Sequence, residues 1–188
     1  MRSHFMVLLG AVLYPLWLLA GFLDYLLHRR SDIEITSGHK ESWFHVLQFA
    51  SLAVPVLLVT CFKFTPLVFA VILACLLAHT LLAHADVTYT EGLRRISPLE
   101  QLVHAFMIVL PLAAVAILGA MHWGDMQSLP WTFSPRDPPL PWPAAALFLG
   151  SFFVLGGVPV LEEFLRTSGR LRHHQVEHRD QGRESHHA

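Results

Sequence analysis

Long apolar segments alternate with short polar connections along this chain. Five such segments are expected, with ends uncertain by a few residues, at about 6–27, 42–62, 66–84, 99–121 and 142–165. At a rise of 1.5 Å per residue, a helix of about 20 apolar residues crosses the roughly 30 Å hydrocarbon core of a bilayer. The pattern therefore predicts an all-α integral membrane protein, with a domain of five transmembrane helices over residues 1–165.

The composition agrees with this class. The chain has 188 residues, of which 54% are hydrophobic and only 14% charged, whereas a soluble domain carries about 25% charged residues. The first segment has a longer apolar run than a signal peptide and no small-residue cleavage site, so it is expected to remain as a helix. Residues 166–188, rich in histidine and arginine, are expected to form a disordered cytoplasmic tail.

Basic residues indicate the orientation, because positive charge gathers on the cytoplasmic side of membrane proteins. The connections after the first and third segments, together with the tail, hold Arg29, Arg30, Lys40, Arg94, Arg95, Arg166, Arg170, Arg172, Arg179 and Arg183. The opposite side has only Arg2, Lys63 and Arg136. The N-terminus is therefore expected outside and the C-terminus in the cytoplasm, in a bacterial inner membrane. This topology explains the basic residues, and nothing indicates a nucleic-acid partner.

Acidic and histidine residues recur at the ends of the segments, with three residues between acid and histidine. The pairs are Asp24 and His28, Glu41 and His45, and Glu100 and His104, with His79, His84 and Asp86 forming a fourth group. On a helix, residues i and i+4 lie on one face, about 6 Å apart along the axis. Each pair can thus offer an oxygen and an imidazole nitrogen to one metal centre.

The predicted topology brings these four groups into one layer near the cytoplasmic interface. Ionisable groups in the hydrocarbon cost roughly 2.5 to 3.5 kcal/mol each on insertion scales and commonly mark function. Soluble four-helix bundles use inward carboxylates and histidines to hold di-iron or di-manganese centres. The first four spans are therefore expected to form a metal-binding bundle.

The ligand types limit the metal. Imidazole and carboxylate without thiolate suit iron, manganese or zinc, and these ligands are too many for one tetrahedral zinc. Two ions are expected, and iron is expected in preference to manganese or zinc. Cys61 and Cys75 lie within spans without metal or redox spacing and are expected to act as small apolar residues.

A simpler interpretation is that the acids pair with basic residues and the histidines are interfacial. The basic residues available for such pairs are Arg29, Arg30, Arg94 and Arg95. This interpretation gives no reason for a histidine one turn from each acid. Participation in the site is left open for His39, Glu91, Glu162 and Glu163.

The placement of these histidines loosely resembles that of the membrane-bound histidine-motif di-iron enzymes, the fatty-acid hydroxylase and desaturase group. Those enzymes carry clustered histidines around two metals at the cytosolic ends of transmembrane helices. The family's HxxxH and HxxHH boxes are absent, and this chain has the acid–histidine pairs instead. The resemblance implies oxidation of a lipid-like substrate by dioxygen, with an electron donor that the sequence does not identify.

The expected function is therefore a membrane-embedded di-iron hydroxylase, desaturase or related oxygenase. A zinc-dependent membrane hydrolase of lipid amides or esters is an alternative, with one metal-bound water as the nucleophile. A b-type haem protein is another, with His45, His79 or His104 as axial ligands. A metal transporter is a third, although its ions should bind near the bilayer midplane.

Overall fold

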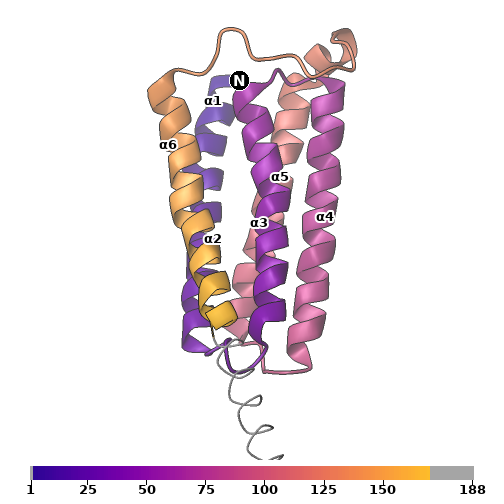
Figure 1. Cartoon of the computed structure of the whole chain (residues 1–188). Helices are drawn as coiled ribbons and strands as arrows, with labels where there is room; N and C mark the ends of the chain where they lie inside the picture. Colours follow the sequence, from indigo (N-terminus) through magenta and orange to yellow (C-terminus); the bar gives the residue numbers. More distant parts are fainter. Residues whose placement is uncertain (1, 170–188) are drawn as a thin grey trace, which may run out of the picture.

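Five long helices run side by side in a computed structural model that describes residues 2–169 (Figure 1). Each is long and apolar enough to cross a membrane, and the described residues contain no strand. The elements are α1 (Arg2–Val7), η1 (Leu8–Leu13) and α2 (Tyr14–Arg30), then α3 (Gly38–Cys61), α4 (Pro66–Glu91), α5 (Pro98–Ser128), α6 (Trp142–Phe152) and η2 (Phe153–Gly157). The first three form one continuous helix, and the last helix extends from Trp142 to Gly169. The expected all-α class, with five helices long and apolar enough to span a membrane, is confirmed for the described residues.

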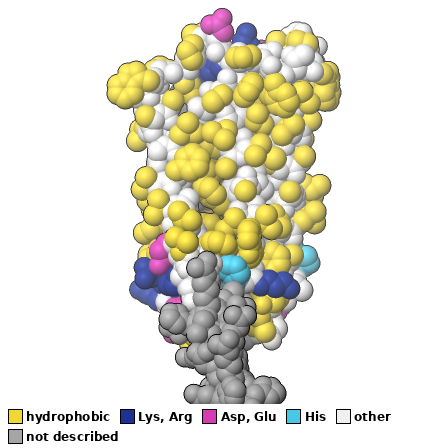
Figure 2. Space-filling view, viewed as in Figure 1, with side chains coloured by type: hydrophobic (Ala, Val, Ile, Leu, Met, Phe, Trp, Pro, Cys, Tyr) yellow, Lys and Arg dark blue, Asp and Glu magenta, His cyan; other side chains and the backbone are white. Residues whose placement is uncertain are grey.

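Apolar side chains cover the outside of the bundle. Leu77, Leu112 and Leu147 are among the exposed large hydrophobic residues, and Leu147 is 75% exposed. Figure 2 shows hydrophobic side chains over the middle of the visible face and charged side chains near its two ends. Such a surface suits a lipid environment, because a soluble protein rarely exposes large continuous apolar patches.

The two ends of the bundle differ. The connections 31–37 and 92–97 lie at one end, here called the inner end, and 62–65 and 129–141 lie at the other, the outer end; both names follow the expected orientation. The outer connection 129–141 has no helix and is held by two backbone hydrogen bonds: Lys63 N donates to Ser134 O, and Arg136 N donates to Cys61 O.

Local sequence fixes where α4 and α5 begin. Each starts with a proline at its first position, where no backbone N–H donor is needed. The Thr65 side chain accepts a hydrogen bond from Val68 N. Ser97 and Glu100 form a reciprocal capping box at the start of α5. Because Glu100 belongs to this cap, its carboxylate is placed at the inner end.

The helices pack in pairs around apolar clusters toward the middle and outer end. α3 lies mainly against α4, and α2 lies mainly against α5. One buried cluster includes Leu52, Val68 and Ile72, and a second joins Leu18 and Phe152. Toward the inner end, buried polar residues replace this apolar packing.

Two helices depart from regular α geometry. η1 and η2 are π-helical segments inside the first and last long helices, and such segments occur frequently at functional sites. Pro55 in α3 and Pro111 in α5 each remove one backbone hydrogen bond from a helix interior.

The helices extend further than the apolar segments alone predict. α4 continues to Glu91, and α5 continues to Ser128. The last helix also includes residues 166–169, which the sequence pattern predicts to belong to the tail. The histidines at 173, 174, 178, 186 and 187 lie outside the described residues.

Candidate metal centre

A cluster of buried and half-buried polar side chains at the inner end draws on all five long helices. The members are Asp24 and His28 from α2, Glu41, His45 and Gln48 from α3, His79 and Asp86 from α4, Glu100 and His104 from α5, and Glu163 from the last helix. The five carboxylates are each less than 7% exposed. Polar groups buried to this degree need close partners, because burial removes their hydration.

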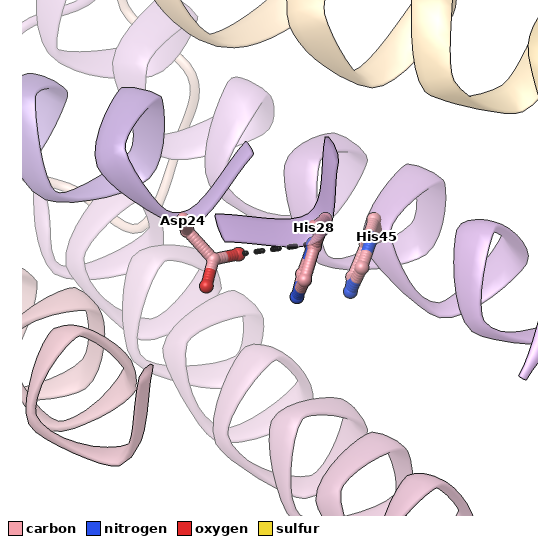
Figure 3. A group of neighbouring side chains, drawn as sticks. All are labelled: Asp24, His28 and His45. Carbon is pink, nitrogen blue, oxygen red and sulfur yellow. Dashed lines mark ion pairs between the residues drawn. The ribbon is translucent and has the colours of Figure 1, made fainter. Parts of the chain in front are cut away.

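Asp24, His28 and His45 form one corner of the cluster (Figure 3). His28 Nδ1 lies 3.7 Å from Asp24 Oδ2, across one helical turn. The His28 and His45 rings are nearly parallel, with centroids 4.6 Å apart and 4° between their planes. Ligand atoms of these three residues lie within 4.8 Å of one another, close enough to bind one ion.

Two further groups of ligand atoms meet the same distance limit and share residues with the first. One joins His28, Glu100 and His104, and the other joins Glu41, His45 and Asp86. Because His28 and His45 each belong to two groups, the groups form a continuous set of donors from four helices.

Several ligand atoms in this region are buried without a hydrogen-bond partner among the described residues. These include Asp24 Oδ1, His28 Nε2 and Asp86 Oδ1. Asp24 Oδ1 nevertheless lies 3.0 Å from His104 Nε2, an ion-pair distance. Since buried polar atoms in native proteins nearly always have a partner, these atoms fit donors to a cation.

A small cavity of about 10 Å³ lies among these side chains. Asp24, Asp86, His45, His79 and His104 contribute to its walls. A space of this volume accommodates about one water-sized probe. The donors and the cavity together fit a bound ion with carboxylate and imidazole ligands.

Arg94 reaches into the cluster from the connection 92–97. Its Nη2 lies 2.7 Å from Glu41 Oε1 and 2.6 Å from Glu100 Oε1. Burial alone would lower the pKa of Arg94, but the hydrogen bonds to Glu100 and Glu41 raise it above its ordinary value. The pairing of acids with Arg94, considered from sequence as a simpler interpretation, is therefore present for these two carboxylates.

The same two carboxylates also face His28. Glu100 Oε1 lies 3.3 Å from His28 Nε2, and Glu41 Oε1 lies 3.7 Å from it. Ser37 Oγ donates a hydrogen bond to Glu41 Oε2. Glu41 and Glu100 thus lie between a guanidinium and an imidazole, where Arg94 supplies positive charge in the present arrangement.

Glu163 is the principal residue that the sequence did not assign to the site. Its Oε1 lies 2.6 Å from His45 Nδ1, and its Oε2 lies 3.4 Å from His28 Nδ1. Ser42 Oγ donates to Glu163 Oε1 at 3.2 Å. By contrast Glu162 pairs with Arg29 and Arg166 near the surface. The last helix therefore joins the four spans that were expected to form the centre.

Gln48 is a second addition. Its Nε2 donates to Asp86 Oδ2 at 3.0 Å, and the same oxygen lies 3.1 Å from His45 Nε2. Glu41, His45 and Gln48 follow a spacing of four and then three residues, which places them on one helix face. That spacing was the sequence signal that could have identified Gln48.

Two predicted ligands occupy different positions from the rest. His79 is 1% exposed and its Nδ1 lies 3.3 Å from Gln48 O, but it belongs to none of the close ligand groups. His84 is exposed on α4 and lies outside the cluster. His39 is held by Thr167 and Ser168, and Glu91 is exposed.

The charge of the cluster is strongly unbalanced when its imidazoles are neutral. Five buried carboxylates face one buried guanidinium, a net of four negative charges. A buried charge without compensation is very costly. Two divalent cations would balance this charge, as would protonation of the histidines.

An apolar cavity borders the cluster on the side toward the bundle centre. It has a volume of about 90 Å³. Its walls join Asp24, His28, His45, His79 and Glu163 to Trp17, Leu18, Phe49, Leu52 and Phe152. The polar centre therefore faces hydrocarbon side chains.

No protein-family model, curated protein or solved structure matches this chain. The chemistry of the site therefore follows from its geometry.

Proposed function

We propose that this protein is a membrane-embedded, iron-dependent oxidoreductase that oxidises a lipid-like substrate with dioxygen. The observation that supports this most is the buried acid–histidine cluster bordered by an apolar cavity. In a hydroxylation, one oxygen atom enters a C–H bond and the other leaves as water, with two electrons and two protons from an external reductant.

Two ions are proposed because the cluster has two regions with different donors. Asp24, His45, Asp86 and His104 all line the small cavity and would hold one ion there. His28, Glu41 and Glu100 would hold the other, where Arg94 now supplies charge. Bound iron would supply one-electron redox chemistry and activation of dioxygen.

Neighbouring residues would orient these ligands. Glu163 lies at hydrogen-bond distance from His45 Nδ1 and thereby fixes the ring so that Nε2 faces Asp86. Gln48 holds the Asp86 carboxylate by one of its oxygens. Partners of this kind commonly tune a metal site and contribute 10- to 100-fold to its affinity.

The apolar cavity favours oxidation over the alternatives. A hydrolase would need donors placed to stabilise the developing charge on an ester or amide carbonyl oxygen, whereas the walls of this cavity, apart from the cluster residues and Tyr25, are formed by aromatic, aliphatic and glycine residues. The cavities beside the histidines measure about 90 and 10 Å³, well below the roughly 300 to 1,000 Å³ of typical ligand sites. A porphyrin is therefore disfavoured at this position.

The metal content of anaerobically purified protein, measured with its optical spectrum, tests this proposal. We expect about two irons per chain, as in di-iron bundles, and no Soret band. One zinc per chain would support the hydrolase, and a Soret band would support haem.

A pair of variants on α4 links the metal to the reaction. Asp86→Asn changes a buried carboxylate with almost no change in shape, whereas Glu91→Gln changes an exposed one. Lipid extracts from cells expressing each protein would be compared under air and under nitrogen. We expect air-dependent oxidation with wild type and Glu91→Gln only. Equal lipid changes in both atmospheres would reject an oxygenase.

A further inference from the structure

The outer half of the bundle contains a second, much larger cavity, which is partly open to its surroundings. Its volume is about 430 Å³, and its walls come from all five long helices and the outer connection. Protein interiors are generally packed closely, with few voids larger than a water molecule. Cavities of roughly 300 to 1,000 Å³ are typical of small-molecule sites, so this volume suits a bound ligand.

The helices that surround this cavity are irregular beside it. Leu9, Gly10 and Leu13 from the π-helical segment η1 line one wall. Pro55 and Pro111, the interior prolines of α3 and α5, line others. The π-helical segment η1 and both interior prolines therefore lie at the cavity walls, whereas η2 does not.

The lining is almost entirely apolar, with its basic groups toward the outer end. Arg136 and His122 belong to the walls there. His122 Nδ1 lies 2.9 Å from Asp125 Oδ2, and Arg2 pairs with the same oxygen at 3.0 Å. Arg136 is half-buried and has no ion pair within residues 2–169. It is therefore available to an anionic group at the outer end of the cavity.

The inner limit of this cavity approaches the metal centre. Trp17 and Leu52 line both the large cavity and the apolar cavity beside the cluster. Trp17 precedes Asp24 by seven residues on one helix, an axial distance of about 10 Å. Trp17 also stacks on Phe152, with ring centroids 5.7 Å apart. These side chains lie on the direct path between the large cavity and the cluster.

We propose that the large cavity binds a single-chain fatty acid, with its carboxylate at Arg136 and the end of its chain toward Trp17 and Leu52. The apolar walls would hold the chain, and the guanidinium would hold the carboxylate. That this bound chain is the substrate rests on the proposed iron-dependent oxidation. The chain carbons nearest the metal centre would then be those remote from the carboxylate.

Photolabelling tests the position and direction of the chain. The full-length protein, reconstituted in phosphatidylcholine nanodiscs under nitrogen, would be labelled with a fatty acid carrying a diazirine at its terminal carbon. Peptide mass spectrometry should place the adducts at Trp17 and Leu52. Adducts confined to lipid-facing residues such as Leu16 and Leu19 would overturn the proposal.

Two alanines of α5 supply a matched pair of variants. Ala114 lines the large cavity, whereas Ala116 is exposed on the outside of the same helix. Ala114→Phe should reduce specific labelling at least several-fold, and Ala116→Phe should leave it unchanged. Unchanged labelling in a correctly folded Ala114→Phe protein would reject binding inside the cavity.

The carboxylate position is tested by comparing a fatty acid with the alcohol of equal chain length. Each unlabelled compound competes with the diazirine fatty acid for labelling of the cavity. Arg136→Gln should weaken competition by the acid and leave competition by the alcohol unchanged, whereas Lys63→Gln should affect neither. Equal weakening for acid and alcohol would overturn the role of Arg136. Binding is measured under nitrogen, so it is independent of oxidation. If the fatty acid labels the cavity but is not oxidised when air is admitted, the proposed function is rejected and the binding site is retained.

Discussion

Glu163 Oε1 lies 2.6 Å from His45 Nδ1, although the two residues are 118 positions apart in the chain. This contact attaches the last helix to α3 inside the polar cluster. Glu163 also approaches His28 on α2. One carboxylate therefore contacts two histidines on two other helices and fixes the positions of their rings.

Removing the charge of Glu163 should weaken metal binding. In Glu163→Gln, we expect a 10- to 100-fold loss of metal affinity, because partners that orient ligands commonly contribute this much. Metal titration of the purified protein measures the effect. Glu162→Gln is the control, since Glu162 pairs with Arg29 and Arg166 instead. Equal affinity in the two variants would contradict the orienting role of Glu163.

Replacing Arg94 should destabilise the protein more when metal is withheld. Arg94→Gln leaves Glu41 and Glu100 buried without their guanidinium partner, and breaking a buried ion pair in this way commonly costs about 3 to 5 kcal/mol. Thermal unfolding in detergent, with and without added Mn²⁺, measures the loss of stability and its recovery by the ion.

The exposed Arg95 provides the control, and Arg95→Gln should unfold like wild type. We expect Mn²⁺ to raise the unfolding temperature of Arg94→Gln more than that of wild type, because the ion would replace the missing charge. No recovery with metal would argue against an ion between Glu41 and Glu100.

Two histidines should respond differently to substitution. His104 lies 3.0 Å from Asp24 and belongs to a close ligand group, so His104→Ala should lower metal occupancy sharply. His84 is exposed, so His84→Ala should retain wild-type occupancy. The metal content per chain of each purified variant measures this difference. Equal loss of metal in both variants would show that His84 also belongs to the site.

The orientation of the bundle remains a prediction from its basic residues. A reporter fused after Ala188 should behave as cytoplasmic, and one inserted near Ser134 should behave as external. Activity of alkaline phosphatase and fluorescence of green fluorescent protein at each position measure this. The reverse pattern would place the polar cluster on the external side.

The sequence predicted the number of long apolar helices because long apolar segments have few other stable arrangements. It also identified the inner end as the polar end, since the acids and histidines occur where apolar segments finish. Seven of the nine predicted ligands contribute to the close ligand groups. Their identity as ligands stays a prediction.

His84 lies outside the cluster because α4 is longer than its apolar segment predicts. Its span was expected to finish at residue 84, but α4 continues to Glu91. On a continuous helix, Asp86 returns to nearly the same face as His79, whereas His84 points about 140° away from His79 at 100° per residue. With the correct helix length, the sequence would therefore have placed Asp86 on the face of His79 and His84 on a different face.

Glu163 and Arg94 could not be assigned for different reasons. The last helix is apolar on most sides, so its sequence does not indicate which of Glu162 and Glu163 faces inward. Arg94 belongs to a short connection whose path depends on contacts with other helices. Its charge was explained equally well by membrane topology.

Glu100 couples the first turn of α5 to the cluster. Its backbone N–H donates to Ser97 Oγ, its Oε2 accepts from Ser97 N, and both carboxylate oxygens accept from Arg94. A carboxylate that rotates toward an ion would release the Ser97 amide, and loss of such capping bonds costs about 1 kcal/mol. Amide hydrogens at the start of α5 would then exchange faster with solvent while the site itself becomes more rigid. The loss of these hydrogen bonds at the start of α5 would thus offset part of the free energy of ion binding.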